Sequence, residues 1–246
     1  RMSRGLGDVY KRQIILYAKA NCKGGCDVIH YLLILRFEVY AMFCKNYDSF
    51  ISLLSRRNYT VHTARDGAQA RDILLSLVPE GSTAGFGGSM TAKELCLAEA
   101  LRGKGCTTYF HWEAAAEERG EVTRRAARAD WFIASANGIT RSGKIVNIDG
   151  TGNRVASMLF GPKNVALIIG KNKFAETMDE CMDRIKTVAC ARNAQRLGLS
   201  TPCAVAGRCV DCFSKERICS VTTIIEAKPG AISEMHLILV DEVLGY

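Results

Sequence analysis

The chain has 246 residues, of which 48% are hydrophobic and 24% charged, with 22 glycines and four prolines. That much apolar side chain supports a packed core, and so few prolines exclude a collagen-like or proline-rich chain. The net charge is +8, but residues 1–41 carry seven basic and three acidic side chains, so half of that excess lies in the first sixth of the chain. No basic run is interleaved with aromatic residues, which argues against nucleic-acid binding.

No segment of the sequence has the length and composition of a membrane span or a secretory signal. The longest apolar stretch covers residues 28–43, and His30, Arg36 and Glu38 interrupt it, so it falls short of the roughly 20 apolar residues that cross a bilayer. The N-terminus lacks an apolar run followed by a small-residue cleavage site. We therefore expect a cytoplasmic protein with no membrane insertion.

The first 41 residues do not share the regular pattern of the rest of the chain. The opening RMSRGLGDVYKRQ has neither a helical nor a strand period, and Arg1 is not a natural start. We expect residues 1–41 to be a leader outside the domain, with Met42 as a plausible native initiator. The alternative is an additional helix over residues 28–43.

From residue 43 onward, helical and strand patterns alternate. We expect helices at residues 43–57, 67–77, 91–102, 114–128, 153–159 and 175–197, the second of them capped by Asp66. Between and after these helices we expect strands at residues 59–64, 82–86, 106–112, 131–135, 144–148, 165–169 and 236–240. Thr91 and Glu94 have capping-box spacing. Strands that are apolar throughout and separated by helices indicate a parallel sheet buried on both faces. The expected fold class is α/β, a doubly wound, mainly parallel sheet over residues 42–246.

The first candidate site is a glycine-rich loop between an expected strand and an expected helix. Its sequence is GFGGSMT, and its candidate ligand-binding residues are Gly87, Gly88, Ser89 and Thr91. Glycines there let backbone N–H groups approach phosphate, carboxylate or acyl oxygens. The loop has neither the Gly-Lys-Ser/Thr of a Walker motif nor the dinucleotide spacing. The alternative is a tight turn in which Ser89 caps the helix.

The second candidate site gathers polar residues and glycines around two strand ends. Asn137 follows one strand, and Asp149, Gly152, Asn153 and Arg154 follow the next. Open α/β sheets bind ligands at the carboxyl ends of their strands, and Arg154 could hold a carboxylate or phosphate with two hydrogen bonds. The alternative is that Asp149 and Asn153 cap the short helix and Asn137 makes a turn.

A single lysine and four scattered histidines complete the candidates for polar chemistry. Lys173 follows the most apolar strand and could neutralise an anionic ligand, although a loop lysine is as often merely solvated. None of the histidines pairs in sequence with a nucleophile, so no catalytic dyad is visible and the catalytic residues stay unknown. His62 and His236 fall in strands, where a core or edge histidine is expected.

Four cysteines are concentrated near the C-terminus. Cys203, Cys209, Cys212 and Cys219 span 17 residues, with a Cys-x2-Cys pair at the centre. Four thiolates at this spacing could close a tetrahedral zinc site or hold an iron–sulfur cluster, and the spacing does not decide between them. Disulfide bonds and unrelated cysteines are the alternatives. The helical cysteines Cys96, Cys181 and Cys190 are expected to be ordinary small apolar residues.

Several motifs, read together, resemble the lactate utilization (LUD) domain family. They are GFGGSMTAKEL, SANGITRSGKIVNIDGTGNRVASMLFGPKNVALIIGKNK, RIKTVACARNAQRL, PCAVAGRCVDC with ERIC, and the terminal EVLGY. The resemblance covers residues 43–246. It implies a divergent form of the fold shared by ribose-5-phosphate isomerase, glucosamine-6-phosphate deaminase and CoA transferases. It also implies a part in oxidising L-lactate to pyruvate alongside iron–sulfur and oxidoreductase subunits.

This chain departs from the iron–sulfur subunit of such a complex because it lacks the paired cysteine-rich ferredoxin motifs. It is similar instead to a stand-alone LUD protein with one four-cysteine segment, and the catalytic glutamate of CoA transferases has no matching motif. Two hypotheses remain. The chain is a subunit or accessory factor of lactate oxidation that binds a small anion, or it is a self-contained enzyme for a sugar-phosphate or acyl-CoA substrate.

Overall fold

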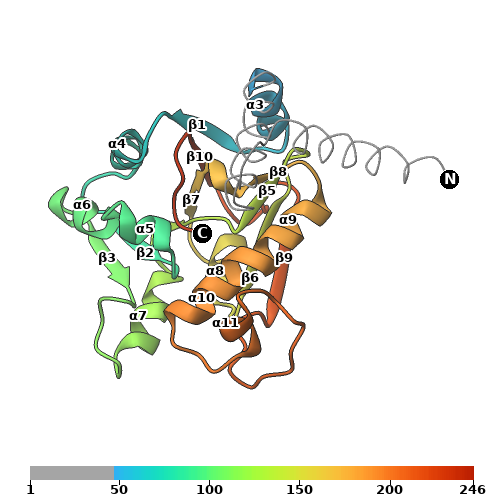
Figure 1. The fold of residues 1–246 in the computed structure, drawn as a ribbon. Coiled ribbons are helices and arrows are strands. Elements are labelled where there is room, and N and C mark those ends of the chain that lie inside the picture. The colour runs from blue at the N-terminus through green and yellow to red at the C-terminus, as the bar shows by residue number, and fades with distance from the viewer. Residues whose placement is uncertain (1–46) are drawn as a thin grey trace, which may run out of the picture. The chain divides into compact units, whose positions relative to one another are not determined.

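A computed structural model of the protein describes residues 47–246, and apolar strands alternate with helices along this part of the chain (Figure 1). The expected leader at residues 1–41, its alternative helix and the first residues of the helix expected at 43–57 lie outside the described residues. The remainder of that helix is α3 (Tyr47–Arg56), which buries Phe50 and Leu54. Among the described residues, no helix is both long enough and apolar enough to cross a membrane.

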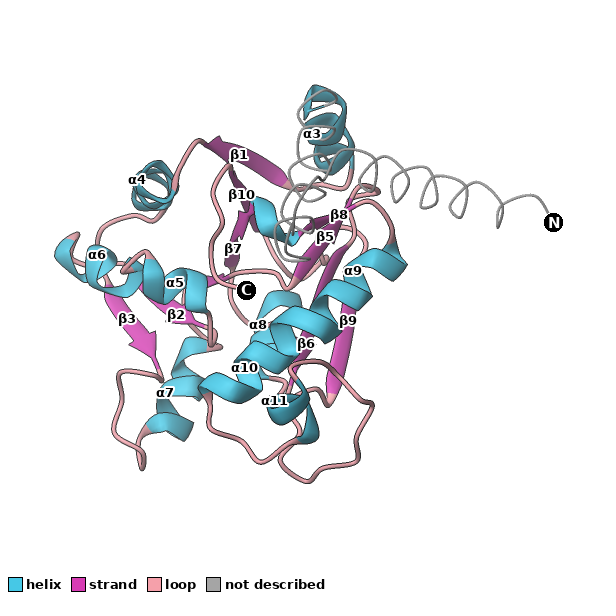
Figure 2. Ribbon diagram, viewed as in Figure 1, coloured by secondary structure: helices cyan, strands magenta, loops and turns pink. Residues whose placement is uncertain are grey.

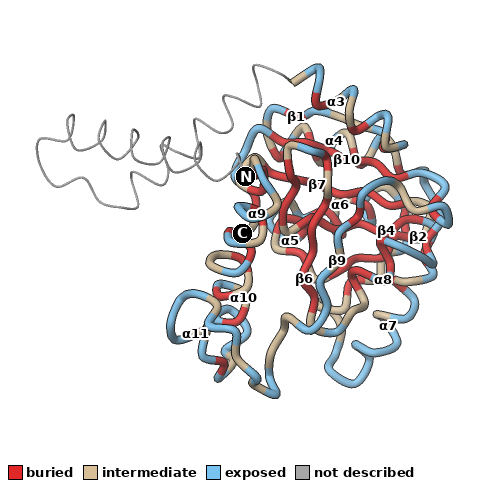
Figure 3. The backbone as a smooth tube through the Cα atoms, turned by 90° about the vertical axis from the view of Figure 1, so that its right-hand side faces the viewer, coloured by how far each residue is buried: buried red, intermediate tan, exposed pale blue. Residues whose placement is uncertain are grey.

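The centre of the fold is a six-stranded parallel sheet, as the apolar strands predict. Its strands, in sheet order, are β1 (Thr60–Ala64), β10 (Glu234–Val240), β7 (Asn164–Gly170), β4 (Trp131–Ala134), β2 (Thr83–Phe86) and β3 (Thr107–Phe110). Every pairing in it is parallel. The strands at its centre are almost entirely buried (Figure 3), which explains why they read as unbroken apolar runs.

Helices cover both faces of this sheet (Figure 2). On one face, α4 (Gly67–Leu77) and α6 (Leu97–Gly103) bury leucines against Phe86 and Ile133. Gly85 points to the opposite face because side chains alternate along a strand, and there it lies against the backbone of α7 (Arg119–Ala126). The α/β, doubly wound, mainly parallel fold predicted from the sequence is therefore confirmed.

A second sheet of four strands was not predicted. It contains β8 (Phe174–Ala175), β5 (Gly138–Thr140), β6 (Ile145–Asp149) and β9 (Val221–Ile225), in that order. The strand expected at 144–148 is β6, which pairs antiparallel with β5 and β9 here and does not join the central sheet. β5 and β8 are too short to give a strand pattern in sequence, so their pairing defines them. β9 is a run of five β-branched residues, which favours a strand, and it was missed beside the cysteine segment.

The long helix expected at 175–197 is divided into α9 (Met178–Arg184), a π-helical turn (Ile185–Ala189) and α10 (Cys190–Arg196). Ile185 and Cys181 pack against Val146 of the second sheet. A π-helical turn inserts an extra residue per hydrogen-bonded ring, and such turns are frequent at functional sites. The short helices α8 (Asn153–Leu159) and α11 (Pro202–Ala206) complete this side of the fold.

The helix expected at 91–102 is also interrupted, and its predicted capping box is wrong. Cys96 has a φ of +50°, which separates α5 (Met90–Glu94) from α6. Ser89, not Thr91, caps α5, because the Ser89 hydroxyl accepts a hydrogen bond from the Ala92 N–H at 3.2 Å. The Thr91 hydroxyl is thereby left for a different partner.

The order of the strands creates a switch point between β2 and β4. The chain leaves β2 toward β3 at one edge of the sheet, and it leaves β4 toward β7 in the opposite direction. The two connections pass over opposite faces, so a crevice opens between the carboxyl ends of these neighbouring strands. The loops that begin at Gly87 and Ser135 line that crevice.

Candidate functional site

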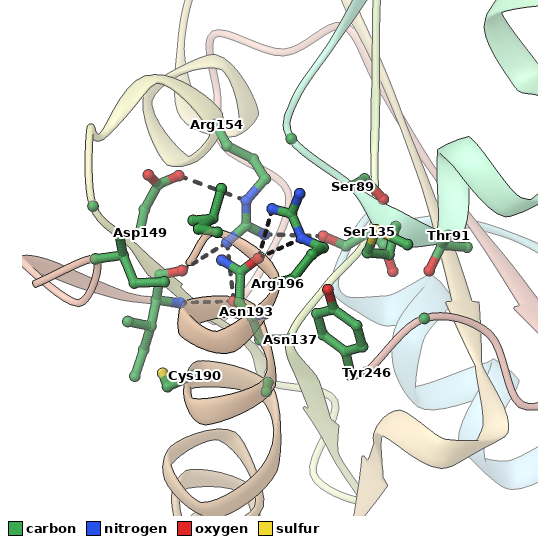
Figure 4. Close-up of a pocket in the computed structure, with 18 of the residues that line it drawn as sticks. Ser89, Thr91, Ser135, Asn137, Asp149, Arg154, Cys190, Asn193, Arg196 and Tyr246 are labelled. Atoms are coloured by element: carbon green, nitrogen blue, oxygen red, sulfur yellow. Dashed lines mark hydrogen bonds and ion pairs between the residues drawn. The ribbon is translucent and has the colours of Figure 1, made fainter. Parts of the chain in front are cut away.

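A pocket with a cavity volume of about 280 Å³ lies at the switch point (Figure 4). It gathers most of the ligand-binding residues predicted from three separate segments of the sequence. Those that line it are Gly88, Ser89, Thr91, Asn137, Asp149, Asn153, Arg154 and Lys173. The loops after β2, β4 and β7 emerge at one edge of the parallel sheet, which brings the glycine-rich loop, Asn137 and Lys173 together. The other three residues lie at the end of β6 or just after it and reach the pocket from the second sheet.

Two predicted residues, Gly87 and Gly152, do not line the pocket but shape its walls. The Gly87 N–H donates to the Ile133 carbonyl at 3.2 Å, and a Cβ at Gly87 would lie 2.7 Å from Cγ of Arg154. Gly152 has a φ of +87°, which favours glycine, and its N–H donates to Asp149 Oδ1 at 3.0 Å. Gly87 therefore makes room for Arg154, and the left-handed backbone of Gly152 presents its N–H to Asp149.

Arg154, predicted to hold an anion with two hydrogen bonds, already has a protein acceptor for each of its four Nη hydrogens. Its Nη1 donates to the Ser135 carbonyl at 3.2 Å and to Asn147 Oδ1 at 2.7 Å. Its Nη2 donates to Asn137 Oδ1 at 2.9 Å and to the Ile148 carbonyl at 2.7 Å. Nε lies 3.5 Å from Asp149 Oδ2. Arg154 therefore fastens the loop after β4 to β6, and holding an anion would require it to exchange these partners.

Asn137 and Asp149 likewise fix the backbone of the pocket. Asn137 Oδ1 accepts from the Ile148 N–H at 2.9 Å, and Asp149 Oδ1 accepts from the Thr151 N–H at 3.1 Å. The Asn137 carbonyl accepts from Arg184 Nη1 at 2.7 Å, which ties α9 to the site. These contacts give the pocket a preorganised wall, so a bound ligand would not need to order it.

Lys173 is the cation that faces the interior of the pocket. It lies at the end of a 3-10 turn (Lys171–Lys173) directly after β7, and only 3% of its surface is exposed. Its Nζ donates to Ser135 Oγ at 2.7 Å and to Thr91 Oγ1 at 3.0 Å, while Ser135 Oγ donates onward to the Ile168 carbonyl. The alternative of a merely solvated loop lysine is therefore excluded.

The surroundings of Lys173 disfavour its charge. Burial, together with the positive charges of Arg184 and Arg154, lowers the pKa of Lys173 to about 7, and Glu94 opposes the shift. Its two hydroxyl partners carry no negative charge. An anion placed beside Nζ would supply the missing counter-charge, and perturbed lysines of this kind concentrate at functional sites.

Several residues that line the pocket were not identified from the sequence. The described ones with polar or aromatic side chains are His111, Trp112, Ser135, Asn193, Arg196 and Tyr246. The Arg196 guanidinium lies 4.5 Å from the centre of the Trp112 ring and donates to Asn193 Oδ1. The three-residue spacing of Asn193 and Arg196 places them on one helix face, but sequence does not show which way that face points.

The C-terminal residues reach the pocket by crossing over the glycine-rich loop. The Gly245 N–H donates to Glu94 Oε2 at 2.7 Å, and the Gly245 carbonyl accepts from Asn172 Nδ2 at 3.2 Å. These bonds hold the Tyr246 ring beside Asn137 and Ser135 (Figure 4). The terminal EVLGY motif therefore forms part of the site.

Three buried polar atoms in the pocket wall have no hydrogen-bond partner among the described residues. They are His111 Nδ1, the Tyr246 hydroxyl oxygen and Asp149 Oδ2, the last of which is only ion-paired with Arg154. Burial and the charge of Arg119 lower the pKa of His111, with Asp149 opposing, so the ring is neutral at pH 7 and one of its nitrogens can accept. Since buried polar atoms are usually satisfied, these atoms indicate a polar occupant.

The histidines of the central sheet lie apart from this pocket. His62 Nε2 and His236 Nδ1 are 3.1 Å apart on β1 and β10, and the two rings stack at 5.3 Å between centroids. His236 is buried and also stacks on Trp131. The expectation of core or edge histidines is confirmed.

The cysteine segment surrounds a second, smaller cavity. Cys203, Cys209, Cys212 and Cys219 line it together with Cys190 of α10, and all five are free thiols. Cys190 packs against the core beside Ile185 and Cys181, as expected of a small apolar residue, and it also lines both cavities. Within residues 47–246, no three His, Cys, Asp or Glu side chains are arranged in metal-binding geometry. The predicted metal centre therefore stays a prediction.

Comparison with known proteins agrees with the resemblance stated above. A family model described as the LUD domain matches residues 47–240. The chain belongs to the LUD domain family. At the level of the family, this supports a role related to lactate utilization.

A solved structure of a DUF162 family protein from Deinococcus radiodurans is similar to this chain at 12% sequence identity. The match covers 83% of this chain and 98% of the other, with a TM-score of 0.45. A search of curated proteins finds no match.

Proposed function

We propose that this LUD protein is a subunit or accessory factor in the oxidation of L-lactate to pyruvate, and that its pocket binds the small carboxylate. The buried Lys173 at the switch point is the observation that carries the proposal. Its ammonium has two neutral hydroxyl partners and no buried carboxylate beside it. A ligand carboxylate is the complement that such a cation lacks.

The charge balance of the lining favours an anion over a cation. Lys173, Arg154 and Arg196 line the pocket, and Asp149 is the one acidic residue among the described lining residues. Asp149 is paired with Arg154, so the two charges offset each other. Lys173 inside and Arg196 near the rim remain to attract a negatively charged ligand.

A 2-hydroxy acid also suits the acceptors of the pocket. Its carboxylate matches the cations, and its hydroxyl can donate to an atom that has no hydrogen-bond partner in the described structure, either His111 Nδ1 or Asp149 Oδ2. A site that holds a substrate hydroxyl through a buried acceptor discriminates strongly against analogues without one. We therefore expect lactate to bind in preference to propionate.

The partners in this proposal are the iron–sulfur and oxidoreductase subunits that the family resemblance implies. The described pocket supplies binding groups but no electron acceptor of its own, so oxidation would require such a partner or a redox group. The alternative function is a stand-alone enzyme for a sugar phosphate or acyl-CoA, which the cavity volume of about 280 Å³ leaves open.

Calorimetric titration tests the proposal. The ligands are L-lactate, pyruvate, propionate, ribose 5-phosphate and acetyl-CoA, and the variants are Lys173→Met and Lys171→Met. Lys171 is a matched control, because it lies on the same turn but outside the pocket and bonds to Asp241. We expect lactate or pyruvate to bind the parent and Lys171→Met, and to bind Lys173→Met at least tenfold more weakly.

If ribose 5-phosphate or acetyl-CoA binds tightly and neither lactate nor pyruvate binds, the alternative function replaces the proposal. Binding of lactate that Lys173→Met leaves unchanged would remove Lys173 from the site. In addition, a strain that lacks this gene is expected to lose growth on L-lactate, and unimpaired growth would contradict a role in its oxidation.

A further inference from the structure

The cysteine cavity, defined by Cys190, Cys203, Cys209, Cys212 and Cys219, draws thiols from two parts of the chain. Four of them come from the segment after α10, and the fifth comes from α10 itself. Thiols that are distant in sequence do not converge on one small cavity by helical or strand periodicity. Their convergence therefore reflects the tertiary fold around them.

The cysteine segment orders itself without an apolar core. No residue from Pro202 to Ser220 is buried, and Val205 and Phe213 are 89% and 96% exposed. Backbone bonds attach the segment at two points, from the Cys209 N–H to the Lys186 carbonyl at 3.1 Å and from the Ser220 N–H to the Asp149 carbonyl at 2.9 Å. Cys219 packs against the core, and Gln195 Nε2 donates to the Ala204 carbonyl at 2.9 Å. Because the segment buries little apolar surface, metal coordination would add stability that burial does not supply.

Hydrogen-bond donors and a cation surround the sulfur atoms. Asp211 has a φ of +51°, and its backbone N–H donates to Cys209 Sγ at 3.4 Å. The Thr201 hydroxyl lies 3.3 Å from Cys203 Sγ. Arg217 donates to the Cys219 carbonyl at 2.9 Å and lines the same cavity. Backbone N–H groups presented by a left-handed residue and donors to sulfur are typical of sites that bind thiolate metal centres.

We propose that Cys190 joins the loop cysteines in holding one thiolate-bound metal centre, a zinc ion or an iron–sulfur cluster. Four thiolates complete either kind of site, so with Cys190 as one ligand we expect one of the four loop cysteines to stay outside the coordination shell. The thiols are not at coordination geometry in the described structure. The loop can close on the metal because none of its residues is locked in the core.

This metal site is part of the wall of the ligand pocket. Cys190 and Ile218 line both cavities, so a single layer of side chains separates them. Cys190 directly follows the π-helical turn, and Asn193 and Arg196 lie three and six residues further along α10. Metal bound at Cys190 would therefore fix the helix that presents Asn193 and Arg196 to the ligand. This second step rests on the proposed function of the pocket.

Metal analysis tests the site without any ligand. The chain is purified anaerobically, loaded separately with Zn²⁺ and with Fe²⁺ plus sulfide, and analysed for metal, sulfide and visible absorbance. We expect about one zinc ion, or iron and sulfide in equal amounts, per chain. The variants are Cys190→Ser, the double variant Cys209→Ser/Cys212→Ser, and the control Cys96→Ser, whose thiol is exposed outside the cavity.

Both cavity variants are expected to lose at least half of the metal, and the control is expected to keep it. The double variant should also become sensitive to protease within residues 200–220 while circular dichroism of the rest is unchanged. Full metal content in Cys190→Ser would exclude Cys190 as a ligand. Failure of the parent to bind either metal, with all five thiols titratable, would overturn the site.

The coupling to the pocket has its own readout. Metal loading is expected to tighten lactate binding at least threefold in the parent and to have no effect in Cys190→Ser. Equal affinity with and without metal would refute the coupling but leave the metal site standing. If lactate does not bind at all while metal does, the proposed function fails and the metal site remains.

Discussion

Lys173 makes the affinity of the pocket for an anion depend on pH in a defined direction. A carboxylate binds the protonated amine, and burial lowers the pKa of that amine to about 7 in the free protein. The protonated fraction is therefore about ten times smaller at pH 8 than at pH 6, and about 90 times smaller at pH 9. Lactate stays ionised throughout this range, so its affinity should fall by the same factors.

Two other titratable groups that face the site are shifted away from the range above pH 7, in which the slope is measured. Burial lowers the pKa of His111 and raises that of Tyr246. The slope therefore reports on Lys173 alone.

The assay is calorimetric titration of L-lactate at pH 6, 7, 8 and 9, with the uncharged lactamide as a matched ligand and Lys173→Met as the matched variant. For lactate only, we expect the affinity to fall about fivefold from pH 7 to pH 8 and about ninefold from pH 8 to pH 9, and we expect no slope in the variant. An affinity for lactate that stays constant within twofold from pH 6 to pH 9 would refute the reasoning.

Four further predictions concern the walls of the pocket and the fold. Gly85→Ala is expected to destabilise the protein by about 3 kcal/mol in urea unfolding, because the new Cβ would lie 2.2 Å from the Ala126 carbonyl oxygen; an unchanged midpoint would contradict this packing. Arg154→Lys should lower the free energy of unfolding by about 3–5 kcal/mol in the same assay, because it removes the guanidinium N–H groups that donate to Asn137 Oδ1 and Asn147 Oδ1. A loss below about 1 kcal/mol would show that these bonds are dispensable. Gly88→Val introduces a branched side chain at a position where a Cβ alone would lie 3.1 Å from the Trp112 ring. Calorimetry should therefore show a loss of lactate binding, with little change in the melting temperature. Full affinity of the variant for lactate would remove this loop from the site. The protonated form of Lys173 is unfavourable only in the folded state, so the free energy of unfolding of the parent should rise with pH between about 7 and 10.5. Lys173→Met should lack that part of the rise. Identical pH profiles of the two proteins would contradict the burial of the charge.

Local pattern in the sequence is enough to determine the central sheet and the loops at its edge. The run Val165–Ile169 within β7 has no polar residue, which a strand covered on both faces requires. Glycines and polar residues after β2 and β4 mark loops, and the parallel arrangement then brings those loops to one edge. The candidate residues of the pocket could therefore be predicted from three separate segments.

Only the tertiary structure decided the environment of each side chain. Lys173 reads as a loop lysine in sequence, and it is buried because Thr91 and Ser135, 82 and 38 residues away, fold over it. Cys190 reads as a small helical residue, and it lines two cavities because the loop after α10 returns to it. Sequence periodicity shows which residues share a face of an element, whereas the partner of that face depends on contacts between distant segments. β5 and β8 of the second sheet were missed for the same reason, since these short strands are defined by their pairing.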